Sequence, residues 1–258
     1  MFDAMFDWRL VSDDVRGMAA RILIALPSAD FDPTEVAVPW NTARHAGVEV
    51  VFATEDGGRA TCDELVLHGP LFGLLGAKKV NCQLYERLSS DAAFAAPYRF
   101  ADVDVKSFDG LLLPGGHAKG MRSYLESDQL QAVVLEFMRR DLPIAAICHG
   151  PVVLARTIDP QTGRPIVAGR HMTALTRPLE NVAWLLTAWF LGDYYRTYPT
   201  WVEAELRQAI GADGVFERGP LFARYSSGFV VKDRNLLTAR WPGDASRFAD
   251  EFVAMLTP

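Results

Sequence analysis

The sequence contains few cysteines and no excess of positive charge. Its three cysteines, Cys62, Cys82 and Cys148, are an odd number without a C-x-x-C pair, which argues against a disulfide framework and is typical of a reducing, cytoplasmic setting. The net charge is -6 at pH 7. Because no basic face is available for a phosphate backbone, we expect no nucleic-acid partner.

Long apolar runs are also missing. The longest, at 182–191, is too short to span a bilayer, so we expect no membrane partner. Residues 1–20 lack the basic start and apolar centre of a secretory signal. No repeat or low-complexity linker divides the chain. Since half of the residues are apolar, we predict one domain over residues 1–258 with a large core.

Short apolar runs alternate with helical segments along the chain. The runs predict strands at 21–26, 48–54, 108–114 and 143–148, shorter strands around 215–222 and 225–239, and helices at 127–140 and 244–256. This order predicts an α/β three-layer sandwich, with a mostly parallel sheet and helices on both faces. Residues 57–105 are predicted to form an insertion near the carboxyl ends of the strands, where ligands bind in such sheets.

The segment 181–191 predicts a helix that is apolar around most of its circumference. A helix of this kind usually belongs to the core. A dimer contact or a cover over the active site is the alternative.

Cys148 lies where a nucleophile would be expected, at the end of a buried strand and directly before a helix. So sharp a turn needs small residues two places before and two places after the nucleophile, and Ala146 and Gly150 occupy them. The following helix points its N-terminus at the sulfur, which favours the thiolate. His149, the next residue, is a candidate base. A buried and inert cysteine is the alternative.

Two other strands end in residues that could join Cys148. The helix after the first strand begins with Asp32-Pro33-Thr34-Glu35, in which Glu35 could be a proton carrier or simply part of a capping box. The third strand ends at Gly115 and Gly116. We predict that the backbone N–H groups of Gly116 and His149 form an oxyanion hole, although paired glycines also occur in ordinary turns.

Together, Glu35, the Leu-Pro-Gly-Gly turn at 113–116 and the segment Ala-Ala-Ile-Cys-His-Gly-Pro at 145–151 resemble the PfpI-like superfamily, which has the class I glutamine-amidotransferase-like fold and includes the Parkinson-disease deglycase. The chain length, the insertion and the segment 169–180 are most similar to the branch of heat-shock chaperones and glyoxalase III enzymes. The resemblance implies a flavodoxin-like sandwich and a homodimer. It also implies that Cys148 is the nucleophile, His149 its base, Glu180 the carboxylate that orients the histidine, and Glu35 a largely protonated acid beside the sulfur.

This resemblance favours a cofactor-free cysteine enzyme that converts a 2-oxoaldehyde into a 2-hydroxy acid. Gly115, His117, Lys119 and Arg122 are candidate substrate-binding residues, because they follow the third strand. One alternative is a stress-response holdase chaperone or an oxidant-sensing protein in which Cys148 is a redox switch. A second is a cysteine hydrolase or hydratase, such as a peptidase, a deglycase or an isonitrile hydratase.

Two further functions are disfavoured by the residues present. A glutamine amidotransferase completes its triad with a His-x-Glu near the C-terminus, but the last histidine here is His171, followed by Met and Thr. We therefore expect no glutaminase activity and no synthetase partner. His45, His68, His117 and His171 stand singly along the chain, so we assign no metal and no cofactor.

Overall fold

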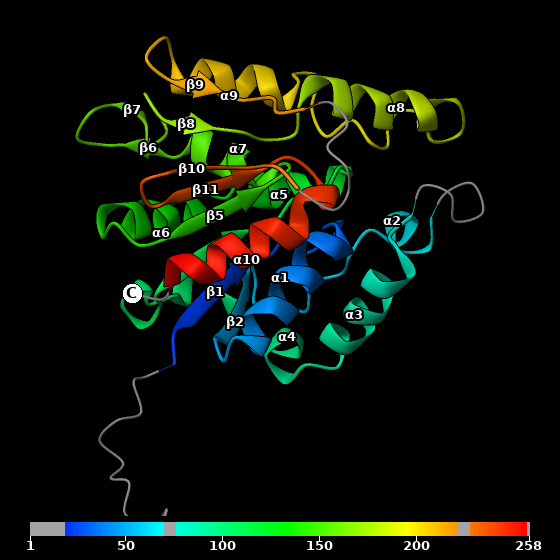
Figure 1. Ribbon diagram of the computed structural model, residues 1–258, viewed down its shortest axis with the longest axis horizontal. Coiled ribbons are helices and arrows are strands. Elements are labelled where there is room, and N and C mark those ends of the chain that lie inside the picture. Colours follow the sequence, from blue (N-terminus) through cyan, green and yellow to red (C-terminus); the bar gives the residue numbers. More distant parts are fainter. Residues whose placement is uncertain (1–18, 70–75, 221–227, 257–258) are drawn as a thin grey trace, which may run out of the picture.

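A seven-stranded, mostly parallel sheet runs through the centre of the protein in this computed structural model, which describes residues 19–69, 76–220 and 228–256 (Figure 1). The strand order is β10-β11-β5-β4-β1-β2-β3, and only the β10–β11 pair is antiparallel. The strands are β1 Arg21–Ala25, β2 Glu49–Thr54, β3 Tyr98–Arg99, β4 Gly110–Leu113, β5 Ile144–Ile147, β10 Val230–Asp233 and β11 Leu236–Ala239.

Helices cover both faces of this sheet. Helices α1 (Pro33–His45) and α10 (Ala245–Leu256) pack against each other on one face, and α6 (Asp128–Arg139) and α7 (Gly150–Arg156) pack together on the other. Helix α1 begins at Asp32, whose carboxylate accepts hydrogen bonds from the N–H groups of Thr34 and Glu35. This arrangement confirms the predicted α/β class.

The bounds predicted from the sequence agree with the structure for the central strands and helices. The four core strands and the helices α6 and α10 lie within two residues of the predicted bounds. Two differences concern the later strands and the insertion. Only Val215–Phe216 (β9) is a strand in the described part of 215–222, and residues 221–227 lie outside the described ranges. The segment 57–105 contains β3, which pairs with β2 and extends the sheet, as well as the helices α2 (Glu64–His68), α3 (Lys79–Ser89) and α4 (Ala92–Ala95).

An additional layer lies beyond α7 (Figure 1, top). It contains α8 (Arg177–Leu191), α9 (Val202–Ile210) and two small sheets, formed by β6 (Ile158–Asp159) with β7 (Arg164–Pro165) and by β8 (His171–Met172) with β9. Helix α9 packs on α7. The short segments η3 (Phe100–Asp102), η4 (Val105–Ser107), η5 (Lys119–Met121) and η6 (Pro242–Asp244) and the short helix α5 (Arg122–Leu125) complete the described structure.

The prediction that the apolar helix 181–191 belongs to the core is wrong. Glu180 and Thr187 are the buried residues of α8, whereas Leu185 and Trp189 are 57% and 74% exposed. The helix lies in the outermost layer, with one side toward a cavity that is described below. Among the described residues, none of the helices combines the length and the apolar character that a membrane crossing requires.

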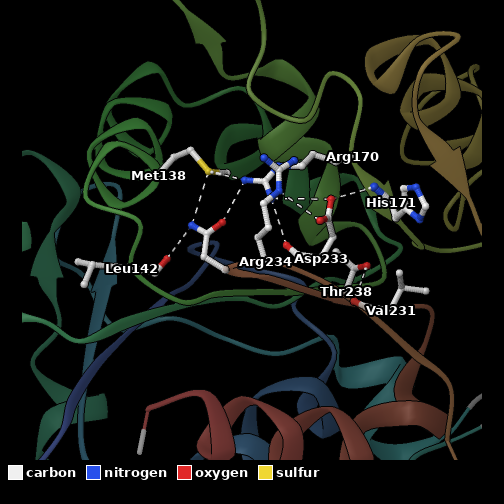
Figure 2. Close-up of polar contacts among 9 residues, drawn as sticks. Met138, Leu142, Arg170, His171, Val231, Asp233, Arg234 and Thr238 are labelled. Carbon is white, nitrogen blue, oxygen red and sulfur yellow. Dashed lines mark hydrogen bonds and ion pairs between the residues drawn. The ribbon is translucent and has the colours of Figure 1, made fainter. Parts of the chain in front are cut away.

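A polar network fastens the outer layer to the edge of the sheet (Figure 2). The Arg170 guanidinium donates to the Asp233 carbonyl oxygen at 3.1 Å and to Asn235 Oδ1 at 3.0 Å. The backbone N–H of His171 donates to Asp233 Oδ2 at 3.0 Å. Because Asp233 and Asn235 flank the β10–β11 turn, these bonds fix the start of β8 against the two strands.

Candidate active site

Cys148 lies directly after β5, at the carboxyl end of the sheet. Its φ of 59° is in the left-handed region, which costs a residue with a Cβ roughly 1–2 kcal/mol. Hydrogen bonds hold the backbone on both sides: Cys148 N donates to the Ala239 carbonyl oxygen, and Leu175 N donates to the Cys148 carbonyl oxygen, each at 3.1 Å. The strained turn predicted from the sequence is therefore present and braced by two neighbouring segments.

Glycines allow the segments of the site to approach closely. A Cβ at Gly150 would lie 2.2 Å from the Leu113 carbonyl oxygen, so the turn after Cys148 can pack on the end of β4 only with glycine there. A Cβ at Gly115 would lie 2.6 Å from His149 N and 2.7 Å from Cys148 Cβ. The two chain turns thus pack backbone against backbone beside the sulfur.

The His149 imidazole lies between the thiol and a threonine. Its Nδ1 is 3.6 Å from Cys148 Sγ, and its Nε2 is 3.3 Å from Thr197 Oγ1. Thr197 donates its hydroxyl proton to the His117 carbonyl oxygen at 2.6 Å. Its Oγ1 can therefore accept a hydrogen bond from His149 Nε2–H. This arrangement selects the tautomer that leaves Nδ1 free to accept the thiol proton.

His117 is also beside the thiol, although it stands alone in the sequence. Its Nε2 lies 3.8 Å from Cys148 Sγ, and its ring makes an edge-to-face contact with the His149 ring at a centroid distance of 5.1 Å. Burial lowers the pKa of His117 to about 4. The sequence analysis named it a candidate substrate-binding residue because it follows the end of β4, and the pairing of β4 with β5 brings it to the thiol.

Glu35 lies on the other side of Gly115 and is fully buried. Its Oε2 accepts the Gly115 N–H at 2.8 Å, whereas Oε1 has no hydrogen-bond partner among the described residues. Burial, followed by the nearby Asp32 carboxylate, raises the pKa of Glu35 well above its usual range. The capping box considered for Glu35 is not formed, because the Asp32 N–H donates to the Gly115 carbonyl oxygen; Glu35 is instead a buried acid near the sulfur.

The electrostatics favour a neutral thiol and a neutral imidazole, not the ion pair suggested by the sequence. Burial, and then the charges of Glu35 and Asp32, raise the pKa of Cys148 well above that of a free thiol. Burial, and then His117 and Arg156, lower the pKa of His149. The backbone N–H of His149 lowers the pKa of the thiol, but burial outweighs this contribution. A charge pair can therefore form only as the sulfur reacts.

Glu180 is not among the groups that contact His149 in the described structure. It lies in the first turn of α8, where its Oε2 accepts the Val202 N–H at 3.0 Å, and burial raises its pKa to about 7. The two imidazole nitrogens of His149 instead face Cys148 and Thr197. The sequence analysis missed Thr197, because nothing along the chain connects it with His149, and the orienting role that the resemblance assigned to Glu180 stays a prediction.

Comparison with known proteins identifies the family. A family model described as ThiJ/PfpI family-like matches residues 26–211, which is well over half of the chain. The chain belongs to the ThiJ/PfpI family. This result confirms the resemblance to the PfpI-like superfamily.

Several members of the ThiJ/PfpI family can be compared with this chain directly. Glyoxalase 3 of Candida albicans is 25% identical over 247 residues, which cover 91% of this chain and 97% of the relative. The glutathione-independent glyoxalase hsp3102 of Schizosaccharomyces pombe is 28% identical over 152 residues, 57% of this chain and 60% of the relative. The crystal structure of glyoxalase III from Candida albicans superposes with a TM-score of 0.68 at 20% identity, covering 92% of this chain and 97% of that one. The chain thus matches less than two thirds of the length of hsp3102 but nearly all of glyoxalase 3.

A cavity of about 490 Å³ adjoins the site in this ThiJ/PfpI family member. His117, Asp32 and Leu175 are among the residues that line it, whereas Cys148 is not: the His117 imidazole lies beside Cys148 Sγ, Leu175 N donates to the Cys148 carbonyl oxygen, and Asp32 N donates to the Gly115 carbonyl oxygen in the turn after β4. Val182 and Leu186 of α8 also line it. This volume is in the range of small-molecule sites, roughly 300–1,000 Å³.

Of the four predicted substrate-binding residues, His117 lines this cavity, whereas Gly115, Lys119 and Arg122 do not. Arg122 Nε donates to the Thr197 carbonyl oxygen at 2.8 Å, and its guanidinium lies over the Tyr198 ring. Arg122 therefore positions the segment that orients His149. The oxyanion hole assigned to Gly116 and His149 stays a prediction.

We expect Thr197→Val to lower kcat/KM for turnover at Cys148 by about 10- to 100-fold, because the His149 imidazole loses the hydrogen-bond acceptor that fixes its tautomer and position. Steady-state kinetics of the substitution, with a pH profile, would measure this effect. Thr157→Val is the matched control, since the Thr157 hydroxyl is equally buried but donates to the Val153 carbonyl oxygen of its own helix. Equal kinetics for the two variants would contradict the role given to Thr197.

We expect Asp32→Asn to stabilise the protein at alkaline pH. Burial raises the pKa of Asp32 from its ordinary value of 3.8 to about 6 in the folded state, so folding favours the protonated form and stability falls as the pH rises through this window. Asparagine caps a helix equally well and cannot ionise. The variant should therefore gain about 1–3 kcal/mol in free energy of unfolding over the wild type at pH 8 and little at pH 4. Urea titrations at both pH values would measure the difference, and an equal change at the two values would contradict this account.

Proposed function

We propose that this protein is a cofactor-independent cysteine enzyme that converts a small 2-oxoaldehyde into the corresponding 2-hydroxy acid. The observation that supports this proposal is the position of His149 Nδ1, 3.6 Å from Cys148 Sγ, in the tautomer that can accept the thiol proton. The likeness to proteins named glyoxalase over most of the chain supports the same reaction.

The reaction begins with a neutral pair. As Sγ attacks the aldehyde carbon, the thiol proton passes to His149 Nδ1 and then to the former aldehyde oxygen, which gives a hemithioacetal. A base removes the hydrogen on that carbon as a proton while the former ketone oxygen gains a proton, which gives an enediol; the adjacent carbon then takes up a proton as the hydroxyl of the sulfur-bearing carbon loses one, so that the former ketone becomes an alcohol and the sulfur-bearing carbon a thioester. Glu35 is suited to carry this proton, because burial raises its pKa above that of an ordinary carboxyl and so makes its carboxylate a stronger base. Water then hydrolyses the thioester, which releases the 2-hydroxy acid and restores the thiol.

The experiment is a direct assay of the chelator-treated wild type with methylglyoxal and no glutathione. We expect lactate to form in equal amount to the methylglyoxal consumed. One alternative on the same site is a hydrolase or hydratase, which would instead act on peptide, glycated-protein or isonitrile substrates. Methylglyoxal loss without lactate, or no loss at all, would reject the proposed reaction.

A holdase chaperone is the second candidate, and the exposed apolar side of α8 favours it. Val182, Leu185 and Trp189 are each more than half exposed. Surfaces of this kind bind other apolar surfaces, either those of unfolded chains or those of a second copy in the homodimer that we also propose. Suppression of citrate synthase aggregation by the wild type, lost in Trp189→Asp but kept in Cys148→Ala, would support the holdase. Sedimentation velocity of the same variants would tell whether the surface is used for dimerisation.

A further inference from the structure

Three atoms that could bind a metal converge at the site. His117 Nε2, Cys148 Sγ and His149 Nδ1 all lie within 4.8 Å of one another, and the sulfur is 3.8 Å and 3.6 Å from the two nitrogens. In a tetrahedral zinc site, Zn–S of about 2.3 Å and Zn–N of about 2.0–2.1 Å place neighbouring sulfur and nitrogen ligands about 3.5 Å apart. The two sulfur–nitrogen distances are within a few tenths of an ångström of this value, and the two nitrogens, which lie within 4.8 Å of each other, would have to come to about 3.4 Å for both to bind one ion.

We propose that His117, Cys148 and His149 bind a single soft divalent cation, for which Zn²⁺ is the probe, and that this binding reversibly switches off the cysteine. The binding itself is independent of the reaction proposed above. The inhibition rests on that proposed function.

The charge balance of the site supports a cation bound through a thiolate. Zn²⁺ with one thiolate and two neutral imidazoles carries one remaining positive charge. Glu35 is fully buried nearby, and its Oε1 lacks a hydrogen-bond partner among the described residues, so its carboxylate would neutralise that charge without being a ligand. Upon binding, the thiol proton is released to solvent as the thiolate forms.

The group beside His149 also suits a metal site, whereas His117 Nδ1 has no hydrogen-bond partner among the described residues. Metal-bound histidines usually donate their second ring N–H to a fixed acceptor, and His149 Nε2 has such an acceptor in Thr197 Oγ1. The same hydroxyl donates to the His117 carbonyl oxygen and thereby fixes the backbone of the second histidine. His117 also lines the cavity, which provides the side from which a cation reaches the cluster.

Occupancy would inhibit the enzyme and not activate it, because the metal would take the groups that the reaction uses. The Sγ lone pair that attacks the aldehyde and the Nδ1 lone pair that accepts the thiol proton would both be directed at the cation. A bound thiolate is a weaker nucleophile toward carbon than a free one, so alkylation of Cys148 would slow together with turnover.

The test uses the full-length, chelator-treated protein and measures binding without substrate. We expect calorimetry to give one equivalent of Zn²⁺ bound, and Co²⁺ to give a thiolate-to-metal charge-transfer absorption. His117→Asn should weaken Zn²⁺ binding at least about 100-fold, since loss of even a second-layer partner costs 10- to 100-fold. Cys148→Ser should abolish the charge-transfer band. His68→Asn and Cys82→Ser, which change an exposed imidazole and a distant half-buried thiol, should bind as the wild type does.

Other results would overturn the metal binding, the inhibitory role or the proposed reaction separately. Absence of binding at micromolar Zn²⁺ would overturn the proposal, as would binding that His117→Asn and Cys148→Ser leave unchanged in variants shown by circular dichroism to be folded. If one equivalent binds but iodoacetamide still labels Cys148 at the metal-free rate, the inhibitory role is overturned. Lack of methylglyoxal turnover by the metal-free wild type would reject the proposed reaction alone, because the calorimetric and spectroscopic results do not depend on it.

Discussion

Cys148→Ser is expected to lower kcat/KM for methylglyoxal by at least about 1,000-fold, because it removes the nucleophile on which every later step depends. Serine has nearly the same shape as cysteine and can occupy the same strained turn. A hydroxyl, however, is far less acidic than a thiol, and in the described part of the chain no carboxylate is hydrogen-bonded to His149 to strengthen it as a base. The residual activity would measure what the surrounding groups contribute without covalent catalysis.

Cys82→Ser is the matched control for this measurement. Cys82 lies on α3, where its thiol faces the carbonyl oxygens of Leu67 and Ala77, and serine can keep both contacts. Its activity should equal that of the wild type, and thermal unfolding of the two variants should show that both remain folded. Turnover by Cys148→Ser within a few fold of the wild type would mean that the sulfur does not carry the reaction.

Asp244→Asn is expected to lower the free energy of unfolding by about 3–5 kcal/mol, because it leaves a buried guanidinium without its counter-charge. Arg240 and Asp244 are each only 1% exposed and form a two-pronged ion pair, with Nε to Oδ2 at 2.9 Å and Nη2 to Oδ1 at 3.0 Å. Asp244 Oδ1 also accepts the Phe229 N–H at 2.8 Å. The pair thus holds the end of β11 against the start of α10.

Glu136→Gln provides the comparison for Asp244→Asn. Glu136 and Arg140 form an i,i+4 pair at 3.9 Å in which both side chains are well exposed, and such pairs contribute about 0.3–0.5 kcal/mol. Guanidinium chloride titrations of both variants at neutral pH would give the two free energies. If the two substitutions cost the same, burial of the Arg240–Asp244 pair does not have the energetic weight assigned to it.

The sequence was sufficient for the four core strands β1, β2, β4 and β5 and for the turn at Cys148, because these are determined locally. Buried strands have continuous apolar runs, and the strained turn needs small residues at fixed offsets from the cysteine, which Ala146 and Gly150 supply. Glu35 could be predicted because it lies a short distance beyond a strand that ends at the same edge of the sheet.

The surroundings of the thiol could not be predicted in the same way. Thr197 reaches His149 from a loop 48 residues further along, and no periodic pattern relates the two positions. The sequence suggested a thiolate from the helix N-terminus, but the protonation state depends on burial and on the Asp32 and Glu35 carboxyls together. The apolar run of α8 did not indicate burial, because composition alone cannot distinguish a core helix from one whose side chains line a cavity and face solvent.

The support of His149 by Thr197 links activity to a part of the protein that we expect to open before the sheet unfolds. Thr197 belongs to the outer layer, in which the Arg170 network and β8 contact the edge of the sheet and α9 packs on α7. Opening of such a layer normally requires less free energy than global unfolding. Mild denaturant should therefore abolish turnover while the amide protons of β1, β4 and β5 remain protected from hydrogen exchange, so that the working lifetime of the catalyst is shorter than that of its fold.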